Sequence, residues 1–151
     1  MKTLLILFIL NVHCYSQTFA FEKERHEFNR ALIEQKVVNK IQKKSYDGVY
    51  EYEAKYLGEF KTKNGQYYII NSSYIHLKKL YNDNEIFIYN SKKQFLGYYN
   101  LASNYQLPIK LINNSLFFKT DNCISKVDLK NGIPRVICIG CPERKDCIEF
   151  L

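Results

Sequence analysis

The pattern of apolar and polar residues divides the chain into a short apolar leader, a charged stretch and a series of short alternating segments. The leader is an unbroken apolar run, Leu4–Leu10, between Lys2 and a more polar tail that ends at Ser16. This order predicts a secretory signal peptide over residues 1–16. The run is too short to span a membrane, which takes about 20 apolar residues. A short buried strand or helix at the N-terminus is the alternative interpretation.

Cys14 raises a further alternative, a lipid-modified cysteine of the bacterial lipoprotein type. Such signals place a small residue before the cysteine, whereas His13 precedes Cys14. We therefore expect a mature chain of residues 17–151, exported to the periplasm, the cell surface or the medium. Its 135 residues (151 minus 16) suit a single domain with a buried core.

The stretch Glu22–Lys44 predicts a helix. It contains neither Gly nor Pro, and its glutamates lie early and its lysines late, as the helix dipole favours. Its apolar residues recur at helical spacing: Phe28, Ala31, Leu32, Val38 and Ile41. A basic amphipathic helix for a membrane or a partner is one interpretation, but packing on the sheet that follows is the simpler one.

From Val49 onward the period changes to that of strands. In Val49–Tyr56 one parity carries Tyr50, Tyr52, Ala54 and Tyr56, while the other carries Val49, Glu51, Glu53 and Lys55. This alternation predicts a strand with its tyrosines on a core and its charges in water. Further strands are expected between turn residues: Tyr67–Ile70, Glu85–Tyr89, Phe95–Leu101, Ile109–Ile112, Leu116–Thr120, Ile124–Leu129 and Arg135–Ile139. We expect one α+β domain, with the N-terminal helix packed on an antiparallel β-meander that closes as a barrel-like or sandwich-like sheet.

The mature chain has four cysteines near its C-terminus: Cys123, Cys138, Cys141 and Cys147. An even number in an exported chain predicts two disulfides that staple the C-terminal region. A zinc site is an alternative, although only Cys138 and Cys141 have the spacing of a zinc knuckle. A redox pair is the other alternative, but such motifs follow a strand in a βαβ unit.

Hairpin geometry gives a specific pairing. If Asn131-Gly132 is a two-residue turn, Cys123 and Cys138 point to the same face as diagonal neighbours. The register then favours the bridges Cys123–Cys138 and Cys141–Cys147, the second closing a tight loop.

Signatures of catalysis are missing from the mature chain. His26 and His76 have no metal-binding spacing, and there is no His-Glu-x-x-His, Gly-x-Ser-x-Gly or Gly-rich phosphate motif. Glu51 and Glu53 share a strand face and are candidates for an acid/base pair, but a solvated strand surface is the simpler interpretation. We therefore predict no catalytic, cofactor-binding or metal-binding residue.

Charge and tyrosine content supply the remaining hints. The formal net charge is +7, or +6 without Lys2. A basic surface attracts anionic polysaccharide, membrane or nucleic acid, but the excess of lysine is explained more simply by solvation, and we expect no nucleic-acid partner. Tyrosine favours interfaces as well as strands. Eleven of the mature chain's tyrosines lie in or near the expected sheet: Tyr50, Tyr52, Tyr56, Tyr67, Tyr68, Tyr74, Tyr81, Tyr89, Tyr98, Tyr99 and Tyr105.

These observations favour a non-catalytic binding module with a protein partner, such as an inhibitor, an immunity-type protein or a surface interaction protein. The alternative is a small exported hydrolase that uses carboxylates, with Glu51 and Glu53 as its candidates.

Overall fold

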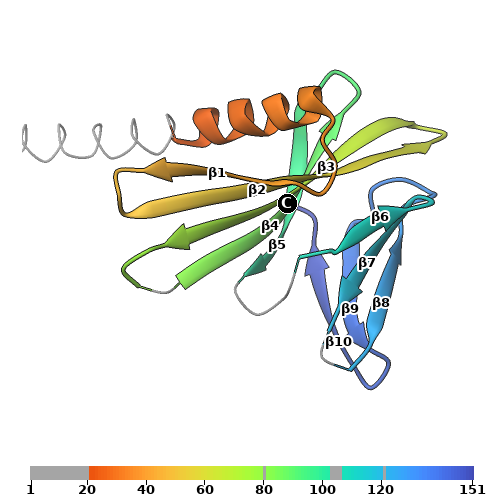
Figure 1. Cartoon of the computed structure of the whole chain (residues 1–151). Coiled ribbons are helices and arrows are strands. Elements are labelled where there is room, and N and C mark those ends of the chain that lie inside the picture. Colours follow the sequence, from red (N-terminus) through yellow and green to blue (C-terminus); the bar gives the residue numbers. More distant parts are fainter. Residues whose placement is uncertain (1–20, 80, 103–106, 121) are drawn as a thin grey trace, which may run out of the picture.

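The structure is a computed structural model that describes residues 21–79, 81–102, 107–120 and 122–151 (Figure 1). The predicted signal peptide, residues 1–16, and Cys14 lie outside the described residues.

Within the described residues, a helix over residues 21–35 is followed by ten antiparallel strands. The first five form one sheet in chain order: β1 (Ile41–Tyr46), β2 (Tyr50–Thr62), β3 (Gly65–His76), β4 (Tyr81–Asn90) and β5 (Phe95–Ala102). The next three form a second sheet: β6 (Lys110–Ile112), β7 (Ser115–Lys119) and β8 (Ile124–Asp128). The last two form a hairpin: β9 (Val136–Cys141) and β10 (Arg144–Glu149). The predicted α+β class, with a helix on an antiparallel meander, is confirmed.

The helix is shorter than the sequence predicts. It ends at residue 35 instead of Lys44, and the end of the predicted helix is β1. Lys36 and Asn39 have φ angles of 53° and 64°, and these left-handed positions turn the chain out of the helix. The late lysines suit an edge strand as well as a helix end, and Lys43 lies opposite Glu53 of β2.

The five-stranded sheet separates two apolar cores. On one face the helix packs over the strands, and that core contains Leu32, Ile33, Tyr52, Ala54, Tyr56, Ile70, Phe87 and Tyr89. The predicted inward parity of Tyr52, Ala54 and Tyr56 is therefore confirmed. A β-bulge between Tyr56 and Gly58 makes Leu57 the extra residue of β2, and Leu57 packs in the other core.

The second core is enclosed by a barrel-like ring of strands. It contains Leu57, Phe60, Ile69, Ile86, Ile88, Tyr99, Leu101, Leu116, Phe118, Val127, Leu129, Ile137 and Ile139. The smaller sheets lie on the side of the large sheet that faces away from the helix (Figure 1). The turn between β6 and β7 joins them to β2, because the Asn114 side chain donates to the Lys61 carbonyl at 2.6 Å.

The end of the chain closes the ring at β5. The backbone N–H of Tyr98 donates to the Leu151 carbonyl at 3.0 Å, and the N–H of Leu151 donates back at 2.9 Å. Gly97 permits this approach: its φ is +153°, and a Cβ there would lie 2.3 Å from the Leu151 carbonyl oxygen. The last residues therefore extend the pairing of β5, whose edge would otherwise be open at this point.

The disulfides join Cys123 to Cys141 and Cys138 to Cys147. Two disulfides near the C-terminus are confirmed, but the pairing favoured from hairpin geometry is wrong. Residues 129–135 form a wider connection than a two-residue turn, and they begin with a turn in which the Gly132 N–H donates to the Leu129 carbonyl at 3.1 Å.

This wider connection moves the register of β9 relative to β8. The Gly140 N–H lies 3.4 Å from Ser125 Oγ, so Cys141, and not Cys138, comes beside Cys123. The segment expected as a disulfide-closed loop is instead β10, in which Cys147 pairs directly with Cys138.

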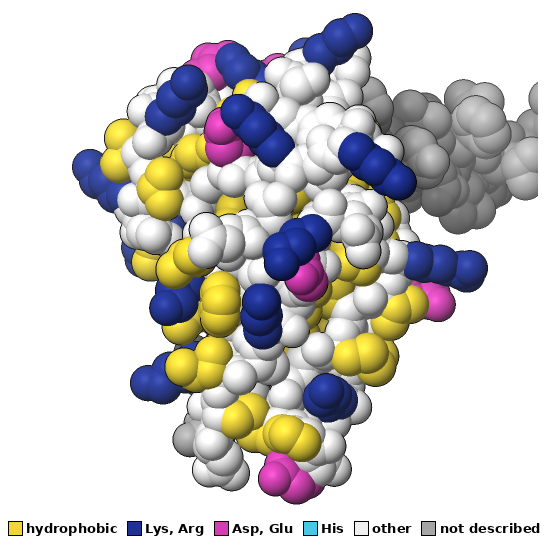
Figure 2. Space-filling model, turned by 90° about the vertical axis from the view of Figure 1, so that its right-hand side faces the viewer, with side chains coloured by type: hydrophobic (Ala, Val, Ile, Leu, Met, Phe, Trp, Pro, Cys, Tyr) yellow, Lys and Arg dark blue, Asp and Glu magenta, His cyan; other side chains and the backbone are white. Residues whose placement is uncertain are grey.

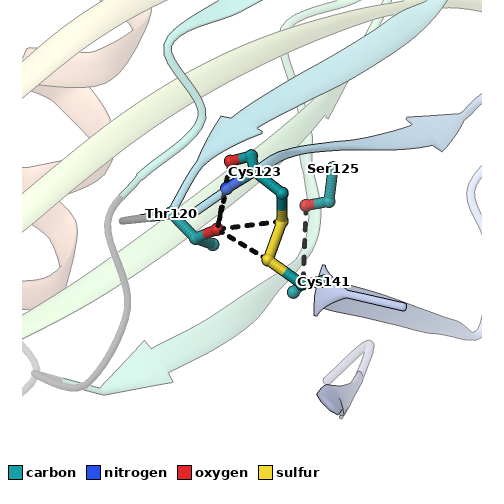
Figure 3. The surroundings of a disulfide bond; sticks show 5 residues. Thr120, Cys123, Ser125 and Cys141 are labelled. Carbon is teal, nitrogen blue, oxygen red and sulfur yellow. Dashed lines mark hydrogen bonds between the residues drawn. A yellow bond between two sulfur atoms is a disulfide. The ribbon is translucent and has the colours of Figure 1, made fainter. Parts of the chain in front are cut away.

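The Cys123–Cys141 bridge joins the residue before β8 to the last residue of β9, and these two strands belong to different sheets (Figure 3). Thr120 Oγ1 lies 3.0 Å from Cys123 Sγ and accepts a hydrogen bond from the Cys123 N–H at 3.3 Å. The bridge therefore holds β8 to β9 at a seam where the two strands share no ladder of backbone hydrogen bonds.

Candidate functional site

Titratable and polar side chains gather between the helix and the sheet. We call this group the helix–sheet polar cluster. The helix contributes Arg25, His26 and Asn29, and the strands contribute Tyr52, Glu85 and Tyr89. Arg25 and Asn29 occupy the same helix face as Leu32 and Ile33, at spacings of four, seven and eight residues. The predicted stripe, which included the exposed Ala31, missed these polar positions because it considered apolar residues alone.

Arg25 and Glu85 form a buried ion pair. Arg25 Nη1 donates to Glu85 Oε2 at 3.1 Å, and each side chain is 9% exposed. The guanidinium also lies over the Phe87 ring at 4.9 Å. Burial raises the pKa of the Glu85 carboxyl, and the positive charge of Arg25 opposes that rise.

A directional chain of hydrogen bonds runs from Tyr52 to His26. The Tyr52 hydroxyl donates to Asn29 Oδ1 at 2.9 Å, and Asn29 Nδ2 donates to the Tyr89 hydroxyl oxygen at 3.0 Å. The Tyr89 hydroxyl lies 2.8 Å from His26 Nδ1. The assignment that gives every hydrogen an acceptor has Tyr89 donating to an unprotonated Nδ1, so the imidazole is neutral.

The surroundings of His26 favour the same neutral state. Burial, together with the nearby positive charges of Arg25 and Arg30, lowers the pKa of His26 to about 4. The His26 ring also packs on Phe95 at a centroid distance of 4.3 Å.

The cluster is closed to a substrate. Asn29, Tyr52 and Tyr89 are fully buried, and burial raises the pKa of both tyrosines. A general acid or base must come within hydrogen-bonding distance of the proton it transfers, whereas these groups are bonded to one another under the helix. The arrangement therefore fixes the helix on the sheet.

Glu51 and Glu53 lie together on the face of β2 opposite Tyr52, as the alternation predicts. Both carboxylates contact the ammonium of Lys43 on β1, Glu51 at 3.0 Å and Glu53 more closely. These hydrogen bonds raise the pKa of Lys43. The two carboxylates are thus cross-strand partners of one lysine, an arrangement typical of a solvated sheet surface.

The tyrosines divide into buried and surface groups. Tyr52, Tyr56, Tyr89 and Tyr99 are buried in the two cores. Tyr67, Tyr68 and Tyr98 are half-buried, and Tyr105 lies outside the described residues. Four others gather with His76 near the start of the described helix, where the Phe21 ring packs on two of them. We call these five residues the aromatic end: Tyr46, Tyr50, Tyr74, His76 and Tyr81.

The strand register builds the aromatic end. It places Tyr46 opposite Tyr50, Tyr50 opposite His76, and His76 opposite Tyr81, so that β1, β2, β3 and β4 each contribute one side chain to a single row. Tyr50 stacks on Tyr74 at a centroid distance of 4.9 Å and an interplanar angle of 12°. Tyr81 is 51% exposed.

The remaining chemistry of the described residues is limited. The four described cysteines are joined in two bridges. In the described ranges no group of three or more His, Cys, Asp or Glu side chains is placed to hold a metal ion. Within those same ranges no helix is long and apolar enough to cross a membrane.

No family model, no curated protein and no solved structure matches the chain.

Proposed function

We propose that the chain is an exported, non-catalytic binding module whose partner is a protein. An inhibitor, an immunity-type protein and a surface interaction protein all fit this description. The observation that carries the proposal is the aromatic end, where the register aligns aromatic side chains from four neighbouring strands in a row of half-buried rings that ends at the exposed Tyr81.

The aromatic end has the properties of a protein interface. Tyrosine adds a large contact area and a polar hydroxyl, yet it loses little conformational entropy on binding. Here neighbouring rings already restrict one another: Tyr50 lies between Tyr74 and His76, whose ring centroids are 4.9 and 4.7 Å away. Preorganised aromatic side chains of this kind are frequent energetic hot spots.

The alternative, a hydrolase with Glu51 and Glu53 as its acid and base, has less support. An acid/base pair needs two carboxyl groups in different protonation states. Glu51 and Glu53 instead contact one and the same ammonium, that of Lys43, so their surroundings do not distinguish an acid from a base.

Export is supported by the predicted signal peptide and by the two disulfides, which suit an oxidising compartment. Intact-mass measurement of secreted material should give a chain that begins at or near Gln17. A mass that retains residues 1–16 would contradict export by this route, and a lipid adduct on Cys14 would favour the lipoprotein alternative.

The binding proposal is tested by capture from the exported fraction of the cells that make the protein. Tagged mature protein should retain one protein in stoichiometric amount, and Tyr81→Ser should reduce its apparent affinity about tenfold, as expected for an interface hot spot. Leu96→Ser is the matched control, because Leu96 is 42% exposed but lies on β5, outside the aromatic end.

Equal capture by the wild type and the Tyr81→Ser variant would contradict the role of the aromatic end. Turnover on a polysaccharide or peptide panel that disappears in Glu51→Gln or Glu53→Gln would instead support the hydrolase.

A further inference from the structure

The outward face of the β6-β7-β8 sheet has an unusual composition for a solvated surface. We call it the basic face. The register places Lys110, Phe117 and Lys126 in one row across the three strands, and Lys119 opposite Ile124 in the next row. Leu116 and Phe118, at the alternate positions of β7, point into the second core.

Cations on the basic face lack acidic partners within the described part of the chain. Lys110, Lys119 and Lys126 form no ion pair there, and the Lys110 ammonium instead lies over the Phe117 ring at 5.2 Å. Asp128 lies at the margin of the face, and its Oδ2 is 3.8 Å from the Nζ of Lys130, outside the row of lysines. The face therefore carries uncompensated positive charge.

The same face also exposes aliphatic side chains. Ile124 is 63% exposed and Ile112 is 45% exposed, although outward positions of a solvated strand are normally polar. Figure 2 shows the side of the molecule on which β6 and β8 lie in Figure 1. Lys and Arg side chains are spread over that side with hydrophobic side chains between them, and acidic side chains are sparser.

We propose that the basic face is a second binding surface, separate from the aromatic end, and that it binds an acidic protein surface. Ile112 and Ile124 give exposed apolar contact area beside the lysines, and protein interfaces combine apolar contact with complementary charge. Three lysines without an ion-pair partner in the described part of the chain favour a partner of negative charge, which would also accelerate association. The two surfaces lie at opposite ends of the molecule: the turn between β1 and β2 is far from β8 (Figure 1).

Other anionic partners fit the composition less well. Single-stranded nucleic acid stacks its bases on successive aromatic rings, whereas this face offers one ring, Phe117, beside the aliphatic Ile112 and Ile124. Peripheral membrane binding buries a continuous apolar surface in the lipid, whereas the exposed Ile112 and Ile124 lie in different rows with the lysine-flanked row of Phe117 between them. Phosphate groups favour the forked guanidinium of arginine, and the cations of this face are lysines.

The test uses the full mature chain and an acidic polypeptide probe, the random copolymer of glutamate and tyrosine. Binding is measured at about 0.1 M salt, where charges beyond about 10 Å are screened. Lys110→Gln combined with Lys126→Gln should weaken binding about fivefold, and Ile124→Ser should weaken it about threefold. The matched control is Lys78→Gln combined with Lys79→Gln, which removes the same charge from exposed positions after β3.

Two results would overturn the proposal. One is equal weakening by both lysine pairs, because the probe would then report net charge alone. The other is tighter, Lys110- and Lys126-dependent binding of a single-stranded oligonucleotide, heparin or phosphatidylglycerol vesicles. Tyr81→Ser should leave copolymer binding unchanged. The proposal for the basic face and the proposal for the aromatic end are therefore tested by different variants and can fail independently. Circular dichroism and thermal unfolding confirm that each variant is folded.

Discussion

His26 makes the stability of the folded protein depend on pH in a window that the structure defines. In the unfolded chain its imidazole binds a proton as the pH falls through the ordinary pKa of 6.5. In the folded protein burial and the two nearby arginines together lower the pKa of His26 to about 4. Between these values protonation favours the unfolded chain, so stability is complete above pH 6.5 and falls as the pH approaches 4.

The size of this loss follows from the two pKa values. One pH unit within the window corresponds to about 1.4 kcal/mol, so the full window would give about 3 kcal/mol. The His26 side chain keeps some contact with solvent, being 19% exposed, and solvent screening reduces the effect. We expect about 1.5 kcal/mol of stability to be lost between pH 6.5 and 4 through this residue.

The assay is urea unfolding of the wild type and a His26→Gln variant at several pH values from about 7 to 4. The variant loses the Tyr89 contact and should be less stable at pH 7, but its stability should decline less toward pH 4. Glu85 acts in the opposite direction: its raised pKa makes the folded state bind a proton first as the pH falls, and it does so in both proteins.

His76→Gln is the matched control, because His76 belongs to the aromatic end and lies outside the polar cluster. The reasoning is refuted if wild type and His26→Gln lose the same stability between pH 6.5 and 4. It is also refuted if His76→Gln removes the dependence.

Three further predictions concern the barrel-like ring and its two bridges. Gly97→Ala should lower the free energy of unfolding by about 3 kcal/mol, because its Cβ would lie 2.3 Å from the Leu151 carbonyl oxygen. Gly48→Ala is the control: Gly48 also has a positive φ, but nothing lies within 4 Å of a Cβ there, so the loss should be about 1 kcal/mol. Urea unfolding of both variants measures the difference. Mild reduction followed by alkylation and peptide mapping should open Cys138–Cys147 first, because both of its cysteines are exposed while Cys123 and Cys141 are half-buried. Replacing Cys123 and Cys141 by serine should cost about 3 kcal/mol, as expected for a bridge that spans 18 residues. Equal cost at both glycines, or first opening of Cys123–Cys141, would contradict this account of the ring.

Most of the strands could be predicted from the sequence, because each has one face on a core and one toward solvent. The alternation in Val49–Tyr56 gave the correct inward residues of β2. Two strands, β1 and β10, were missed for a common reason: neither has apolar residues at all the alternate positions that would form one buried face. β1 reads IQKKSY and β10 reads RKDCIE, so tertiary pairing with β2 and β9 decides their conformation.

The helix–sheet polar cluster could not be predicted because its members are far apart in sequence. Arg25 and Glu85 are separated by 60 residues, and the charged stretch around Arg25 is equally typical of a solvated helix face. Tyr52 was expected on the core face of its strand, and Tyr89 was expected only as part of a strand. Their hydroxyls are satisfied only because Asn29 lies between them, a match that depends on how the helix is placed on the sheet.

The predicted disulfide pairing was wrong for a reason that also explains what each bridge does in the fold. Hairpin geometry assumes that consecutive strands share a backbone ladder, and β8 and β9 do not, since they belong to different sheets. Where the ladder is missing, Cys123–Cys141 supplies the connection, and at the next seam the Tyr98–Leu151 hydrogen bonds join the chain end to β5. Cys138–Cys147 instead reinforces a hairpin that is already paired. The two bridges therefore differ in kind: one closes the ring around the second core, and the other stiffens the hairpin that carries the chain end back to β5.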